Sequence, residues 1–112
     1  MTSRKQRVAE NEALFRDVNE RVIASSGRQA APNETSLFYC ECGDEKCFVH
    51  LRLTRAEYEA IRAHSDRFAV VVEHAVQEAE RIVARHDGYA VVEKHRDVRE
   101  VAEDTDPRGD VA

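Results

Sequence analysis

The fold of this chain is decided by residues 36–53, which read SLFYCECGDEKCFVHLRL. Two short stretches rich in apolar and aromatic residues, 36–41 and 47–53, flank a polar turn that contains glycine and acidic residues. In the second stretch apolar residues recur with a period of two, which is typical of a half-buried strand. The sequence therefore predicts a β-hairpin, and its turn carries the three cysteines of the chain, Cys40, Cys42 and Cys47.

The spacing of these cysteines, C-x-C-x4-C, indicates a metal site. Thiolates are soft donors that hold zinc at about 2.3 Å, and structural zinc takes four thiolate or imidazole ligands. A chain reversal lets three nearby sulfurs converge on one ion, and Gly43 would permit a positive φ in such a reversal. The alternative is that the cysteines are small buried hydrophobic residues. An odd number of cysteines in a polar turn favours the metal, and ligand softness favours zinc, one ion per chain, over iron and copper(I).

The fourth ligand must come from outside the hairpin turn, and five histidines are candidates. His50 lies three residues after Cys47 in a predicted strand, so the two side chains should point to opposite faces. His74 closes the predicted strand 68–73, where a sheet edge can meet the hairpin turn, and it is the preferred ligand. If no histidine binds, the fourth position stays open, as in a catalytic zinc site. The remaining candidates are His64, His86 and His95.

The chain as a whole predicts a single zinc-binding α+β domain over residues 1–95. Residues 8–24 should form an amphipathic helix, with an apolar stripe toward the core and a Glu12–Arg16 ion pair on another face. A linker of small and turn-forming residues follows. Thr54 and Glu57 form a capping box that begins a central helix, 55–64. The small antiparallel sheet, with its zinc-stapled hairpin, should contain strands near 36–41, 47–53, 68–73, 81–85 and 89–94.

The region 75–94 fits two patterns. Its first apolar residues fit a helical stripe, whereas Asp87-Gly88 is a strong signal for a type I′ turn between two strands. The hairpin around Asp87-Gly88 is the preferred interpretation. Residues 96–112 are polar and acidic and contain Pro107 and Gly109, so they are predicted to form a disordered acidic tail.

Five stretches carry a resemblance to other proteins: residues 11–21, 40–47, 53–58, 68–74 and 80–94. They resemble N-E-A-L-F-R-x-V-N-E-R, C-E-C-G-x3-C, L-T-x-x-E-Y, a strand ending in histidine, and E-R-x-V-x-R-x-D-x-Y-x-V-V-E-K, the pattern of an uncharacterised family of short bacterial proteins. The resemblance implies zinc binding by Cys40, Cys42, Cys47 and His74, and it implies no activity. Around His74 the chain departs from that pattern, because it lacks the proline or glycine expected nearby.

The composition of the chain and the motifs that it lacks disfavour several classes of function. The 112 residues carry a net charge of −5, which disfavours nucleic acid and anionic membranes as partners. No apolar run is long enough to cross a bilayer, and the charged amino terminus lacks a secretory signal, so we expect a cytoplasmic protein. The sequence contains no nucleophile elbow, phosphate-binding loop, dinucleotide fingerprint or H-E-x-x-H motif.

We therefore predict a small intracellular, non-enzymatic zinc protein that acts as a protein-interaction or regulatory module. Its partner would be another protein, or a second copy that docks through the helix 8–24. A thiol-based redox or metal sensor is the first alternative, and a small zinc-dependent enzyme is the second. Four closed ligands would favour the module, accessible thiolates the sensor, and an open site in a pocket the enzyme.

Overall fold

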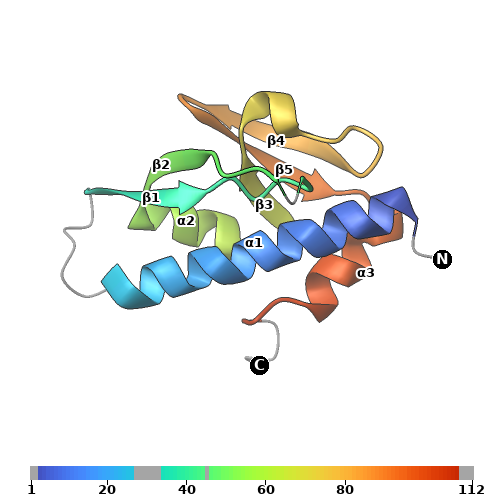
Figure 1. Ribbon diagram of the computed structural model, residues 1–112, viewed down its shortest axis with the longest axis horizontal. Coiled ribbons are helices and arrows are strands. Elements are labelled where there is room, and N and C mark those ends of the chain that lie inside the picture. The colour runs from blue at the N-terminus through green and yellow to red at the C-terminus, as the bar shows by residue number, and fades with distance from the viewer. Residues whose placement is uncertain (1–2, 27–33, 45, 109–112) are drawn as a thin grey trace.

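The computed structural model describes residues 3–26, 34–44 and 46–108 (Figure 1). The predicted linker around 27–33 and the end of the predicted tail, 109–112, lie outside the described residues. The elements are, in chain order, α1 (Arg4–Ser26), β1 (Thr35–Tyr39), β2 (His50–Thr54), α2 (Arg55–Arg62), β3 (Arg67–Val70), the 3-10 turn η1 (Val72–His74), β4 (Glu80–His86), β5 (Tyr89–Lys94) and α3 (Arg96–Asp104). No helix within the described ranges is both long and apolar enough to cross a membrane.

The predicted α+β fold is confirmed, but the strands form two sheets rather than one. β1 and β2 pair antiparallel with Tyr39 opposite His50, and a second antiparallel sheet has the order β3-β5-β4. The prediction of a single sheet is wrong because neither β1 nor β2 pairs with a strand of the β3-β5-β4 sheet. The two sheets meet at a backbone hydrogen bond of 2.7 Å from Glu41 N to Ala69 O.

α1 packs against one face of the β3-β5-β4 sheet, and α2 packs beside β3. The Arg16 guanidinium of α1 lies 4.7 Å from the centre of the Phe68 ring. Phe68 is opposite Val92, and the side chains of opposed residues share a face. The adjacent Val91 faces the other way and lines a hollow together with Ile61 of α2. Figure 1 shows α1 running across the strands, with α3 beside it.

The face of α1 that turns to the interior is partly polar, contrary to the predicted apolar stripe. Glu12 and Arg16 are each 0% exposed, whereas Leu14 is 58% exposed. The Glu12–Arg16 ion pair predicted for an outer face is therefore wrong. Both side chains have buried partners instead: Glu12 accepts a hydrogen bond from Lys94, and Arg16 donates to backbone carbonyls. Lys94 also donates to Glu80 at 3.0 Å, so one buried ammonium bridges two carboxylates.

The predicted capping box is confirmed at the start of α2. Thr54 Oγ1 accepts from Glu57 N at 3.1 Å, and Glu57 Oε1 accepts from Thr54 N at 2.7 Å. The preferred β4–β5 hairpin is also confirmed, with His86 opposite Tyr89. In its turn only Gly88 has a positive φ, 89°, so the type I′ turn, which needs two such residues, is a wrong prediction.

Residues 96–104 form α3, which corrects the prediction of a disordered tail that begins at residue 96. Val98 and Ala102, four residues apart, are buried on one face of this helix. The Ala102 carbonyl accepts a hydrogen bond from Arg16 Nη2 at 2.8 Å. The high charge of the segment concealed this spacing, because composition alone does not separate the solvated face of a short helix from a disordered segment.

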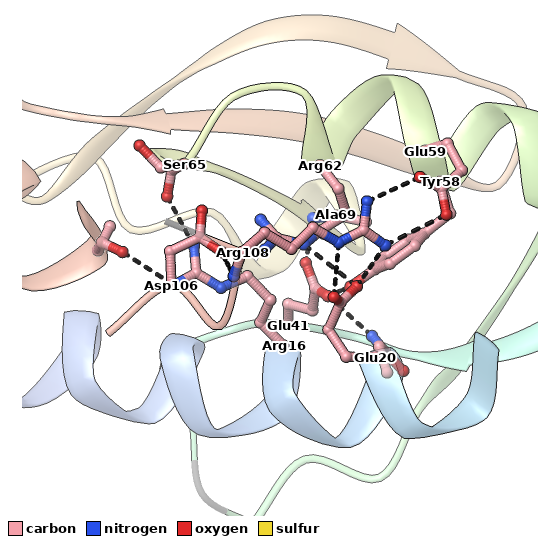
Figure 2. A network of polar contacts seen from close by, with 12 residues as sticks. Arg16, Glu20, Glu41, Tyr58, Glu59, Arg62, Ser65, Ala69, Asp106 and Arg108 are labelled. Atoms are coloured by element: carbon pink, nitrogen blue, oxygen red, sulfur yellow. Dashed lines mark hydrogen bonds and ion pairs between the residues drawn. The ribbon is translucent and has the colours of Figure 1, made fainter. Parts of the chain in front are cut away.

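Ion pairs hold the segment that follows α3 (Figure 2). Asp106 contacts Arg62, whose side chain is 0% exposed. Arg108 lies between Glu20 of α1 and Glu59 of α2, at 2.6 and 2.7 Å. These pairs join both helices to the end of the described chain.

Candidate metal centre

The structure brings together the four residues predicted as metal ligands, Cys40, Cys42, Cys47 and His74. Their sulfur atoms and a ring nitrogen all lie within 4.8 Å of one another. His74 Nδ1 is 3.5 Å from Cys40 Sγ and 3.6 Å from Cys47 Sγ. A tetrahedral zinc ion, with bonds of about 2.3 Å to sulfur and about 2.0 Å to nitrogen, places those two atoms about 3.5 Å apart. These two nitrogen–sulfur distances fit a tetrahedral ion, and the four side chains lie close enough together to hold one.

Local hydrogen bonds fix the cysteine loop. Cys40 N donates to Val49 O at 2.8 Å and so extends the pairing of β1 with β2 beyond the strands. Asp44 closes the turn, because its side chain accepts from Lys46 N at 2.9 Å and its carbonyl accepts from Cys47 N at 3.0 Å. Aspartate favours such turns since its carboxylate bonds the backbone two residues on. The reversal returns Cys47 to the side of Cys40.

His74 reaches the cluster from the second sheet. After β3 the chain turns through η1, where His74 N donates to Val71 O at 2.8 Å. Val71 N in turn donates to Cys40 Sγ at 3.2 Å. The sequence placed His74 at the end of a strand running to residue 73, but β3 ends at Val70 and a 3-10 turn carries the histidine. A metal bound here would join the two sheets.

The three thiols are buried and electrostatically coupled. Cys40, Cys42 and Cys47 are 0%, 1% and 7% exposed. A hydrogen bond from the Cys40 side chain lowers the pKa of Cys42 to about 5. The pKa of Cys40 is raised by the same hydrogen bond and by burial, and the pKa of Cys47 is raised by burial. Without metal the thiolate is favoured at Cys42, and an ion must displace the other two protons, so metal affinity should depend on pH.

Glu41, which lies between two of the cysteines, is buried. A glutamate beside a polar turn is expected to be exposed to solvent, but Glu41 is 0% exposed. Its carboxylate accepts hydrogen bonds from Ala69 N and Asn19 Nδ2, each at 2.9 Å, and from the Tyr58 hydroxyl. Burial raises the pKa of this carboxyl despite the three donors. No sequence pattern distinguishes a buried glutamate from an exposed one in such a turn.

Gly43 is required by packing and not by its backbone angle. Its φ is not positive, so the conformational reason expected from the sequence is wrong. A Cβ atom at this position would lie 2.9 Å from Val8 Cβ and 3.0 Å from Val8 Cα. Asn11 Nδ2, one turn further along α1, donates to the Gly43 carbonyl at 3.0 Å. Glycine therefore lets α1 pack directly on the cysteine loop.

The other four histidines lie outside the cluster. His50 is exposed, and its ring centre lies 4.6 Å from that of Tyr39, on the hairpin face that strand alternation predicts. The remaining three are an exposed His64, a His86 stacked on Tyr89, and a His95 whose Nε2 lies 2.8 Å from the Gln77 carbonyl oxygen.

Comparison with known protein families, with curated proteins and with solved structures finds no match to this chain. The resemblance to the uncharacterised bacterial family therefore stays a prediction.

Proposed function

We propose that this protein is a zinc-stabilised protein-interaction module that catalyses no reaction. The observation that carries the proposal is a contrast within the cysteine loop. The cysteines are at most 7% exposed, whereas Phe48 and Val49, directly after Cys47, are 70% and 45% exposed. Buried ligands suit a structural ion, and neighbouring exposed apolar side chains suit a contact surface.

Zinc is the metal that fits this donor set best. Three thiolates and one imidazole at tetrahedral spacing form a common structural zinc set, and ligand softness ranks iron and copper(I) below it. An ion bound by Cys40, Cys42, Cys47 and His74 would link the β1–β2 hairpin to η1. A domain of this size buries only a small hydrophobic core, so a bound metal ion would add stability that the core alone supplies weakly. The free energy of zinc binding would then form part of the free energy of folding.

The exposed apolar side chains of the hairpin and its loop supply the contact surface in this proposal. Leu37 is 50% exposed, so three of the four large apolar side chains exposed among the described residues lie on the hairpin or its loop. The fourth, Leu14, is on α1, which packs against α3 and β1 within the chain. Self-association through α1 is accordingly the weaker proposal, and a cytoplasmic protein partner is preferred.

The two rival functions require features that this geometry disfavours. A redox or metal sensor needs thiolates that reagents reach, and these sulfurs are buried. A zinc enzyme needs an open coordination position beside a pocket. With His74 as the fourth ligand, no position is left for water or substrate.

X-ray absorption at the zinc edge tests the closed site. Protein made in zinc-containing medium should show three sulfur ligands at about 2.3 Å and one nitrogen ligand at about 2.0 Å. A thiol reagent should modify the cysteines quickly only after a chelator has removed the ion. An oxygen ligand in the spectrum would support the enzyme, and rapid modification of the zinc-loaded protein would support the sensor.

Charge substitutions test the contact surface. Phe48→Glu should abolish a protein contact that wild type makes reproducibly in cells, as measured by crosslinking. Leu14→Glu introduces the same charge on α1 and should leave that contact intact. Sedimentation of the purified wild type distinguishes a separate partner from a second copy. Loss of the contact in both variants, or no reproducible contact at all, would count against the proposed surface.

A further inference from the structure

A carboxylate between two of the predicted ligands ties the cysteine loop to the rest of the domain. Glu41 Oε1 accepts a hydrogen bond from Ala69 N at 2.9 Å, and Oε2 accepts from Asn19 Nδ2 at 2.9 Å and from the Tyr58 hydroxyl. These donors belong to β3, α1 and α2, and Figure 2 shows Glu41 between them. Glu41 N also donates to Ala69 O at 2.7 Å. The centre of the Cys-Glu-Cys segment is therefore held by three other elements.

The Asn19 side chain also contacts Tyr39, and this contact fixes which of its atoms donates to Glu41. Asn19 Nδ2 also donates to Tyr39 O at 2.8 Å, and Asn19 Oδ1 accepts from Tyr39 N at 2.8 Å. Rotating the Asn19 amide by half a turn would place oxygen against oxygen and nitrogen against nitrogen. The group that faces Asn19 Nδ2 must therefore be an acceptor, and the group that faces Ala69 N must be one too. A carboxylate meets both demands, whereas a carboxamide meets only one.

We propose that Glu41 is a positioning residue that controls how long the centre retains its ion, although it does not touch the metal. The inference rests on the proposed zinc function. Because Glu41 holds Cys40 and Cys42 in place from between them, zinc binding requires little ordering of the loop. Val71 N restrains Cys40 Sγ further, at 3.2 Å. Groups that orient metal ligands from outside typically change metal affinity by about 10–100-fold when they are removed.

The rate of zinc release from Glu41→Gln tests the proposal. The substitution keeps the size of the side chain and sets an NH2 group against a donor. Zinc-loaded protein is mixed with an excess of a chromogenic chelator, and release should be about 10–100-fold faster than in wild type. Cobalt(II)-loaded protein should show an altered thiolate-to-metal absorption band. Tyr58→Phe removes one donor and keeps the carboxylate, so it should accelerate release less, and it serves as the test if Glu41→Gln does not fold.

Glu57→Gln is the matched control, because it makes the same chemical change in the capping box of α2, away from the cysteine loop. Glutamine can accept the same hydrogen bond from Thr54 N, so this variant should change the thermal midpoint little and release zinc at the wild-type rate. Wild-type release from both Glu41→Gln and Tyr58→Phe would overturn the inference. Equally fast release from Glu57→Gln would overturn it too. A wild-type protein that binds no zinc would instead contradict the proposed function, and the same chelator assay detects it.

Discussion

Replacing Gly43 by alanine would probe the contact between α1 and the cysteine loop. The new methyl group would lie 2.9 Å from Val8 Cβ and 3.0 Å from Val8 Cα, and rotation of the valine side chain moves neither atom. Nonbonded carbons prefer about 3.5–4.0 Å, so the helix must withdraw by at least about 0.5 Å. Overpacking costs about 1–3 kcal/mol, and the effect of alanine on the unfolded chain offsets about 0.4–1 kcal/mol. We expect a net loss of about 1–2 kcal/mol in the free energy of unfolding.

Urea unfolding of the zinc-loaded protein measures this loss, and Val8→Ala completes a double-mutant cycle. Truncating Val8 removes the methyl carbon closest to the new Cβ, so the double variant should be more stable than the sum of the single effects by about 0.5–1 kcal/mol. If Gly43 were needed only for its backbone angle, Val8→Ala would bring no such relief. Additive effects, or a Gly43→Ala variant as stable as wild type, would refute the close-packing explanation.

Three further predictions follow from the site and the buried charges. His74→Ala should raise the zinc dissociation constant steeply and His50→Ala should change it little, as measured by competition with a chelator; the opposite ranking would exclude His74 as the ligand. Burial raises the pKa of Glu12 well above its usual value, so the stability that it contributes at low pH is lost as the pH rises. Glu12→Gln should therefore become progressively more stable relative to wild type in urea unfolding as the pH rises above the usual range of a glutamate pKa, and a constant difference would contradict the raised pKa. Asp106→Asn should cost about 1.5–3 kcal/mol in thermal unfolding, because it removes a charged partner from the buried Arg62, and no change would show that this contact adds nothing.

Local sequence signals were sufficient to predict the helix and strands around the site. Three signals are each encoded within a few residues: the apolar period of two before Thr54, the capping box that begins at Thr54, and the turn at Gly88. They correspond to β2, to the start of α2 and to the β4–β5 hairpin. The cysteine cluster was predictable for the same reason, since its three sulfurs come from one turn. The position of His74 depends on how the two sheets meet, which local patterns do not encode, and a 3-10 turn in place of the predicted strand end brings it beside the sulfurs.

Pairings between distant residues were not predictable from local patterns. Glu12 and Lys94 are 82 positions apart, and each looks like an ordinary surface charge until the other is placed beside it. The burial of Glu41 is not predictable from its neighbours in sequence, because its hydrogen-bond donors come from three separate elements. The helix at 96–104 was missed because a short, highly charged segment gains its order from packing against α1, which composition does not reveal.

The polar interior face of α1 disfavours misfolded states in which this helix packs in a shifted position. A helix with an aliphatic face that slips by one turn, about 5.4 Å, still buries apolar surface. The same slip in α1 would leave Arg16 and Glu12 without partners in the interior, at a cost of several kcal/mol for each charge. Near-native packings are thereby separated from the correct one by a wide energy gap. Because the partners of these two side chains belong to β5, α3 and the turn after α2, we expect α1 to lock into place only after those segments have assembled.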